Sequence, residues 1–339
     1  MRIAYDVTPL SHPRTGVGNY IRGALKGMLE AAEEADELVA FGPVSLRGRS
    51  TLADALDGLA LEHRTCTVPF AHAVRRTWTT LRSPVAERFI GDFDVLHFTD
   101  WMQPPQRRGA RATMIHDLGP IHFPDRLHPR TVRMHSANAR AARRCDVVFT
   151  NAEFTANDVV ETLGIAKERV RVAYPGIDPD FRPDGERHER GRPYAFTTAT
   201  SDWRKNLDTV RAAWPPLADE LDLVALGDLG YLTPNRLPPF YRGASVFLYP
   251  SRFEGFGMPV IEAMACGVPC VVSAHPSLDE ASGDAAVRVD PESAEAIAAG
   301  VQEALARRDE LVPRGFAHAR RFTWVETGRI HLQGYAEAL

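Results

Sequence analysis

Residues 251–273 read SRFEGFGMPVIEAMACGVPCVVS. One apolar strand is expected just before this stretch, at 245–250, and another at its end, at 270–273. The residues between the two strands predict a glycine-containing loop and a short helix. Pro259 suits the first turn of this helix, where its missing N–H costs nothing, and Gly267 suits its end. A loop that leads into a helix N-terminus presents free backbone N–H groups, which predicts an anion-binding site.

Two carboxylates accompany these N–H groups, Glu254 in the loop and Glu262 about one turn into the helix. Taken singly, Glu262 would offset the helix macrodipole and Glu254 would be a solvated loop residue. Together with Gly255 and Gly257 they better fit a ligand that has hydroxyls at two ends and phosphates between them. One acid would then accept hydrogen bonds from a ribose, and the other from a sugar.

The segment EGFGMPVIEAMACGVP, in which seven residues separate Glu254 from Glu262, resembles the retaining glycosyltransferases of family 4. The resemblance implies an α/β fold of the GT-B type, with two Rossmann-like domains whose parallel sheets face an interdomain cleft. It also implies that Glu254 lies by the transferred sugar and that Glu262 holds the ribose of the donor nucleotide. The donor-binding residues expected in this block are Glu254, Gly255, Phe256, Gly257, Met258 and Glu262.

The composition is that of an ordinary soluble protein. With 339 residues the chain can form two domains, and its 44% hydrophobic and 25% charged content is typical of globular proteins. A net charge of −4 gives no general attraction to nucleic acid. No apolar run reaches the length of a membrane span and four scattered cysteines indicate a reducing compartment, so we expect a cytoplasmic protein whose membrane contact is at most peripheral, at the inner face.

Short apolar runs alternate with longer helical patterns in both halves of the chain, which predicts parallel strands covered by helices. A stretch dense in proline, glycine and charge, residues 175–193, is the best linker candidate. We expect an acceptor-binding domain at 1–183, a shortened nucleotide-sugar-binding domain at 184–321, and a terminal helix at 322–339 that, by the resemblance, crosses back to the first domain. The strands expected in the first domain are 3–7, 38–41, 95–98, 113–115, 147–150 and 170–173.

The first expected strand leads to RTGVGNY at 14–20, where open α/β sheets bind ligands. This turn lacks the third glycine of a dinucleotide fingerprint, which disfavours a dehydrogenase. The resemblance assigns Gly16 and Gly18 to the donor site, whereas a tight turn is the structural alternative. His116, in MIHDLGP, is either structural or, by the resemblance, a contact of the transferred sugar near the reacting carbon. Asp117 would orient its ring or cap the next turn.

Arg204 and Lys205 follow another expected strand, in a strand-to-helix loop. Adjacent arginine and lysine suit a diphosphate, and an exposed basic turn is the alternative. The string RKN resembles the family's diphosphate-binding loop, so we expect Arg204, Lys205, Glu254 and His116 to be the catalytic residues. The family's Gly-Arg at the preceding strand end is replaced here by TTAT at 197–200.

Residues 229–232, LGYL, resemble the loop whose backbone meets the nucleobase in the family, and Tyr231 and Leu232 of this loop are expected donor-binding residues. Only Asp228 separates the expected strand 223–227 from this loop, whereas relatives have a helix and a strand there. We therefore expect a second sheet that is one strand smaller. Two D-x-D strings are interpreted as turn residues rather than metal ligands, and neither a metal nor another cofactor is expected.

Two segments, 75–88 and 126–144, are rich in arginine. Solvated helix faces are the favoured interpretation. A basic surface against anionic lipid or a phosphorylated acceptor is the alternative.

The resemblance implies transfer of a hexosyl unit, with mannosyl favoured, from a GDP- or UDP-linked sugar to a hydroxyl of a glycan or lipid-linked saccharide. The transfer would retain the anomeric configuration, require no metal, and serve polysaccharide biosynthesis. The alternatives are a non-catalytic nucleotide-sugar-binding subunit with a degenerate donor site, and a nucleotide-sugar phosphorylase or epimerase on the same fold.

Overall fold

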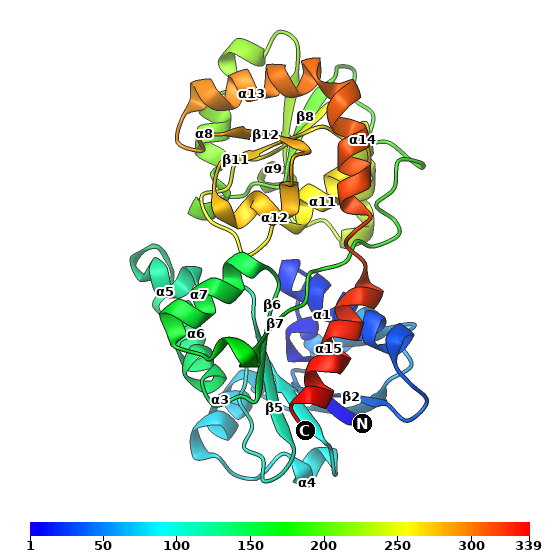
Figure 1. The fold of residues 1–339 in the computed structure, drawn as a ribbon, viewed down its shortest axis with the longest axis vertical. Helices are drawn as coiled ribbons and strands as arrows, with labels where there is room; N and C mark the ends of the chain where they lie inside the picture. The colour runs from blue at the N-terminus through cyan, green and yellow to red at the C-terminus, as the bar shows by residue number, and fades with distance from the viewer. The chain divides into compact units, whose positions relative to one another are not determined.

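The computed structural model describes residues 1–339 as two compact units (Figure 1). Unit 1 comprises Met1–Gly176 and Trp324–Leu339, and unit 2 comprises Ile177–Thr323. The terminal helix is therefore part of unit 1.

The boundary between the units lies at Gly176, seven residues before the expected position, 183. The reason is that the connector packs on unit 2. The backbone N–H of His188 donates to the carbonyl of Pro239 at 2.9 Å, and the guanidinium of Arg242 donates to the carbonyl of Glu186 at 2.7 Å. The second boundary lies after residue 323 rather than 321.

Unit 1 is built on a seven-stranded parallel sheet in the order β3-β2-β1-β4-β5-β6-β7. Its strands are β1 Arg2–Asp6, β2 Glu37–Val44, β3 Glu62–Thr67, β4 Val95–Phe98, β5 Ala110–Ile115, β6 Val147–Thr150 and β7 Val170–Val172. Its helices are α1 Gly16–Ala31, α2 Gly48–Leu56, α3 Ala71–Leu81, α4 Glu87–Ile90, α5 Gly119–His122, α6 Pro129–Ala142, α7 Glu153–Leu163 and α15 Trp324–Glu337.

The strand order of unit 1 reverses between β1 and β4, and this reversal creates a topological switch point at their carboxyl ends. Asp6, the last residue of β1, is fully buried there. Its carboxylate accepts hydrogen bonds from the backbone N–H of Thr8 at 2.9 Å and from the hydroxyl of Thr99. These bonds fix the loops after β1 and β4, where unit 1 is expected to bind its ligand.

Six of the seven strands of unit 1 coincide with apolar runs, whereas β3 was not expected from the sequence. Its residues, EHRTCT, lie at the edge of the sheet and are mostly exposed. An edge strand that buries neither face lacks the apolar pattern by which the buried strands were recognised.

The terminal helix α15 lies alongside α1, and glycines let the two backbones approach closely (Figure 1). A Cβ placed on Gly27 would lie 1.7 Å from the carbonyl oxygen of Trp324, and one on Gly328 would lie 2.1 Å from the carbonyl carbon of Gly27. Gly23 leaves the space that the indole of Trp324 fills. The contact therefore excludes any larger residue at these positions.

Unit 2 is built on a five-stranded parallel sheet in the order β12-β11-β10-β8-β9. Its strands are β8 Tyr194–Thr197, β9 Asp222–Ala225, β10 Val246–Tyr249, β11 Cys270–Ser273 and β12 Ala286–Val289. Its helices are α8 Leu207–Ala212, α9 Leu226–Leu229, α10 Pro238–Gly243, α11 Met258–Ala265, α12 Asp279–Ser282, α13 Ala294–Ala306 and α14 Arg308–Ala319. The order reverses between β8 and β10, so their carboxyl ends form the switch point of this unit.

One expected strand of unit 2, at 223–227, is too long. Strand β9 ends at Ala225, and the helical turn α9 begins at Leu226. The backbone N–H of Gly227 donates to the carbonyl of Ala199 at 3.0 Å, which bends the chain away from the sheet.

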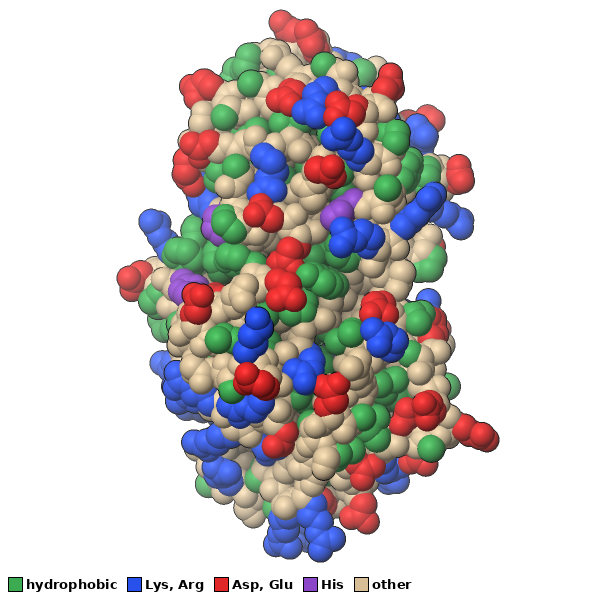
Figure 2. All heavy atoms as spheres, in the orientation of Figure 1, with side chains coloured by type: hydrophobic (Ala, Val, Ile, Leu, Met, Phe, Trp, Pro, Cys, Tyr) green, Lys and Arg blue, Asp and Glu red, His purple; other side chains and the backbone are tan.

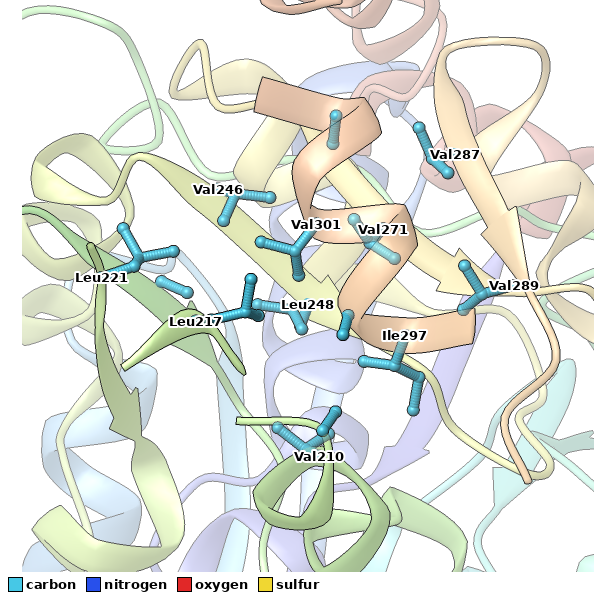
Figure 3. Close-up of a cluster of buried hydrophobic side chains, with 14 of the residues drawn as sticks. Val210, Leu217, Leu221, Val246, Leu248, Val271, Val287, Val289, Ile297 and Val301 are labelled. Carbon is cyan, nitrogen blue, oxygen red and sulfur yellow. The ribbon is translucent and has the colours of Figure 1, made fainter. Parts of the chain in front are cut away.

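The core of unit 2 lies between the sheet and α13 (Figure 3). Val246 and Leu248 of β10 and Val271 of β11 are fully buried, and they pack against Ile297 and Val301 of α13. All four residues of β10 are buried because helices cover both faces of the sheet. This rigid centre holds the loops that follow β8 and β10.

Basic side chains gather on unit 1. On the face shown in Figure 2 they lie along the left and lower edges of this unit, in the region of α3 and α6. Arg75 is an exception to the predicted solvated face, because it is only 4% exposed and its guanidinium lies 4.8 Å from the ring centre of Trp101.

None of the helices combines enough length with enough apolar character to cross a bilayer.

Candidate donor-binding site

Lys205 and Glu254 lie together at the switch point of unit 2. Lys205 ends a short 3₁₀ helix, Trp203–Lys205, in the loop after β8, and Glu254 lies in the loop after β10. The ammonium of Lys205 donates to Oε1 of Glu254 at 2.7 Å and to the hydroxyl of Tyr249 at 2.7 Å. The neighbouring strands β8 and β10 thus bring together two residues that are 49 positions apart.

The charge of Lys205 is maintained by these partners. Burial lowers the pKa of Lys205, but Glu254 and Tyr249 outweigh burial and raise the pKa above its usual value. Burial and the nearby Glu254 raise the pKa of the Tyr249 phenol, which therefore stays neutral at neutral pH. The result is a largely buried ammonium with a fixed direction. Two of its three N–H donors are engaged by the protein.

Arg204, the neighbour of Lys205, is held by Asp202. Nη2 of Arg204 donates to Oδ2 of Asp202 at 2.9 Å, and the backbone N–H of Arg204 donates to Oδ1 at 3.0 Å. Burial raises the pKa of Asp202, but the bonds from Arg204 outweigh it and hold the pKa below its usual value. Sequence analysis missed Asp202, although an aspartate immediately before a helical turn is a known capping signal.

Glu262 lies in α11 and is almost completely buried. Its Oε2 accepts a hydrogen bond from the hydroxyl of Tyr241 at 3.0 Å. Burial raises the pKa of Glu262 to about 7, although the bond from Tyr241 opposes the shift. Near neutral pH this carboxyl is therefore present in both forms. Tyr241 could not be predicted as its partner, because the contact depends on how α10 packs against α11.

The loop before α11 requires a glycine at 257. Gly257 is the N-cap of α11 and has φ +104° and ψ 50°, a left-handed conformation that favours glycine. A Cβ there would also lie 2.5 Å from Cδ2 of Leu278. Phe256 is buried and its ring centre lies 5.2 Å from that of Phe322, so its side chain belongs to the core.

Two further expected donor residues lie in the loop after α9. Tyr231 is an exposed side chain and Leu232 is half-buried. Their contact with the donor base stays a prediction.

The glycine turn of unit 1 is the beginning of a helix. Gly16 is the first residue of α1 and Gly18 is buried in its first turn, whereas a loop was expected up to residue 20. Thr15, the N-cap, makes no side-chain capping bond, so the first N–H groups of α1 lack an intrahelical partner. No atom lies within 4 Å of a Cβ built on Gly16, which leaves its backbone open to a ligand.

His116 follows β5 and is expected to be neutral. Its ring packs edge-on against Tyr20, with ring centres 5.1 Å apart. Burial lowers the pKa of His116 to about 4, and Asp117 only partly opposes this shift. Oδ1 of Asp117 accepts a hydrogen bond from the backbone N–H of Gly119 at 2.8 Å, so Asp117 caps the next turn.

A buried network connects this region to the terminal helix. The hydroxyl of Tyr20 donates to the carbonyl of Ala173 at 2.8 Å and lies 3.1 Å from Nε2 of His331. The hydroxyl of Tyr335 lies 3.2 Å from Nδ1 of His331 and 2.7 Å from Nδ1 of His97. Because Tyr20 contacts His116, helix α15 indirectly supports a candidate site residue.

We expect unit 1 to lose stability as the pH falls from 7 to 5. Burial lowers the pKa of His116 to about 4 and that of His331 to about 3, whereas a histidine in an unfolded chain has a pKa near 6.5. The unfolded chain therefore binds protons first. Each histidine contributes stability that is complete above about pH 6.5 and declines below it by about 1.4 kcal/mol per pH unit.

Thermal melts between pH 5 and 7 check this expectation. The fall in Tm should be smaller for His331→Gln than for the wild type, since the variant lacks one titrating group. Comparing the change of Tm with pH in the two proteins cancels the contributions of other titrating groups, such as Glu262. An equal change of Tm with pH in both proteins would contradict the lowered pKa assigned to His331.

The two D-x-D strings, at 92–94 and 178–180, lie outside the helices and strands, and only the second forms a turn. Oδ2 of Asp94 accepts a hydrogen bond from the backbone N–H of Arg2 at 2.7 Å. Oδ1 of Asp178 accepts one from the backbone N–H of Asp180 at 3.2 Å. Asp94 therefore joins the residues before β4 to the start of β1, and Asp178 stabilises its own turn.

Two doubly wound α/β units, one with a lysine–glutamate pair at its switch point, define the GT-B class of enzymes. Comparison with known proteins gives the family. The family model described as Glycosyltransferase Family 4 matches residues 16–181, and the one described as Glycosyl transferases group 1 matches residues 216–315. The chain therefore belongs to glycosyltransferase family 4, a family of retaining hexosyltransferases that bind nucleotide sugars.

Individual proteins agree with this assignment. The O-antigen chain mannosyltransferase B of Escherichia coli is 26% identical, over 96% of this chain and 96% of its own. The D-inositol 3-phosphate glycosyltransferase of Acidothermus cellulolyticus is 28% identical, over 79% of this chain and 72% of its own. Sucrose-phosphate synthase from Thermosynechococcus elongatus has a similar fold, with a TM-score of 0.71, 17% identity, and coverage of 99% of this chain and 98% of its own.

Proposed function

We propose that this protein transfers a hexosyl unit, with mannosyl favoured, from a nucleotide sugar to a hydroxyl of a glycan or lipid-linked saccharide. The preference for mannose rests on the similarity to a mannosyltransferase along nearly the whole of both chains. The similarity to an inositol-phosphate glycosyltransferase covers less of each chain and makes other hexoses the second choice.

The observation that carries the proposal is the contact between Lys205 and Glu254. The resemblance assigns phosphate to the lysine and the sugar to the glutamate, and their 2.7 Å hydrogen bond supports a site in which both groups would meet the donor where sugar and diphosphate join. The third N–H donor of Lys205 can bind a phosphate oxygen while Glu254 accepts a sugar hydroxyl. Positive charge at this junction stabilises the leaving diphosphate in the transition state.

The remaining donor contacts are proposed from the family resemblance. Glu262, in the helix α11 that follows the same loop, would bind the ribose. Arg204 and the amides near Gly257 would bind the diphosphate, and no metal is needed because these groups supply the positive potential. In unit 1, the open N-terminus of α1 at Gly16 would approach the phosphates, and the neutral ring of His116 would bind a hydroxyl of the transferred sugar.

A thermal-shift screen over GDP-mannose, UDP-glucose and UDP-N-acetylglucosamine tests donor binding, with NAD as the negative control. We expect stabilisation by one donor class and none by NAD. If no donor raises Tm, the proposed function is contradicted. Stabilisation without nucleotide release in the presence of saccharide acceptors would favour the alternative, a non-catalytic nucleotide-sugar-binding subunit.

A lipid-linked acceptor would require contact with a membrane surface, and α3 suits an anionic bilayer. Val74 and Leu81 share one face of α3, at 38% and 69% exposure, and Phe70, which is 86% exposed, immediately precedes the helix. The same segment carries positive charge at the exposed Arg76 and Arg82.

Co-sedimentation with phosphatidylglycerol vesicles measures this contact. The wild type should sediment, and a Phe70→Ser, Leu81→Ser double variant should stay largely in the supernatant. Sedimentation of both proteins to the same extent would argue against the proposed surface.

A further inference from the structure

A cavity of about 70 Å³ lies at the carboxyl ends of the central strands of unit 1. Its apolar side is formed by Val17 and Ile21 of α1, and its polar side includes Asp100, His116 and His135. Space of this size accepts several water-sized groups. The proposed donor chemistry uses only His116 among these polar residues, which leaves the other two without an assigned role.

Asp100 and His135 lie next to each other in the lining of this cavity. Asp100 follows β4 and His135 lies on α6, and Oδ2 of Asp100 is 3.5 Å from Nε2 of His135. This separation is longer than a good hydrogen bond, and both side chains remain accessible, at 18% and 32% exposure. A ligand hydroxyl can therefore donate to the carboxylate of Asp100 while it accepts from a ring N–H of His135.

The charges around the cavity select a neutral ligand. Asp100 and Asp117 both line it, and their negative charge disfavours a phosphate or carboxylate. Burial raises the pKa of Asp100, with His135 opposing and Asp117 adding to the shift. The ring of His116 is neutral at neutral pH. Hydroxyl groups suit these acceptors and donors, and the apolar side formed by α1 suits the C–H face of a sugar ring.

We propose that Asp100 and His135 form the subsite that binds the hydroxyls of the acceptor saccharide. The subsite rests on the proposed function, because it places an acceptor sugar next to His116, the residue expected to contact the transferred sugar. The acceptor is accordingly a neutral sugar residue at the end of a glycan, rather than a sugar phosphate.

Direct binding of a neutral sugar tests the subsite without requiring turnover. The probe is methyl α-mannoside, followed by saturation-transfer NMR on the full chain, with mannose 1-phosphate as the charged comparison. We expect the wild type to bind the methyl glycoside and Asp100→Asn and His135→Gln to bind it at least tenfold more weakly. The exposed Asp125→Asn is the matched control and should bind as the wild type does.

The outcomes separate this subsite from the donor site. Donor binding, measured by the nucleotide-sugar thermal shift, should be unchanged in Asp100→Asn, and acceptor KM should rise with little change in donor KM. If the wild type binds no methyl glycoside, prefers the sugar phosphate, or binds equally well after either substitution, the subsite is wrong. If the wild type binds no nucleotide sugar, that result would instead contradict the proposed function.

Discussion

Replacing Lys205 with alanine is expected to lower the turnover of hexosyl transfer by about 100-fold or more. The ammonium lies between Glu254 and Tyr249 with a third donor directed at the donor-binding region in our proposal. Without it, the developing negative charge on the diphosphate loses its nearest cation, and Glu254 loses the partner that orients it. Initial rates of nucleotide release with saturating acceptor measure the effect.

The matched control is Arg211→Ala, which removes an exposed cation of the same unit that pairs with Asp228. Its turnover should stay within twofold of the wild type. Circular dichroism and Tm establish that Lys205→Ala remains folded. Near-normal turnover in folded Lys205→Ala would exclude the role assigned to this lysine.

Replacing Gly27 with alanine should destabilise unit 1 by about 3 kcal/mol. A Cβ at this position would overlap the carbonyl oxygen of Trp324, a backbone atom that cannot move alone. Helices α1 and α15 must separate, and the buried network of Tyr20, His331 and Tyr335 would lose its geometry. The gain in helix propensity from glycine to alanine, about 1 kcal/mol, offsets only part of this cost.

Chemical denaturation with tryptophan fluorescence measures the change, because Trp324 lies at the contact. Gly191→Ala serves as the control, because no atom lies within 4 Å of a Cβ built on Gly191. The free energy of unfolding of this variant should be nearly that of the wild type. A Gly27→Ala protein as stable as the wild type would contradict the close approach of the two helices.

Local signals predicted much of the fold. In the block that contains Glu254 and Glu262, the apolar strands and Pro259 near the helix start led to the expected strand, loop, helix and strand, and β10, α11 and β11 follow that order. The exposed edge strand β3 and the helical turn α9 were missed. Their backbone conformations depend on the neighbouring strand or on a carbonyl elsewhere in the chain rather than on local pattern.

The candidate site was predicted less completely. Sequence alone indicated Lys205 and Glu254 by their neighbours in the chain, but not that Tyr249 would join them. Tyr241 beside Glu262 was equally hidden, since these pairings arise from the packing of strands and helices. His135 was missed because a single histidine on an arginine-rich helix carries no signal until α6 places it opposite Asp100.

The most direct test of the account is the anomeric configuration of the product. The wild type is incubated with the stabilising nucleotide sugar, a saccharide acceptor and EDTA, and proton NMR follows the new glycosidic linkage. We predict release of the nucleoside diphosphate and, from an α-linked donor, an α-linked product. A β-linked product, or no transfer until a divalent metal is restored, would contradict metal-independent transfer with retention.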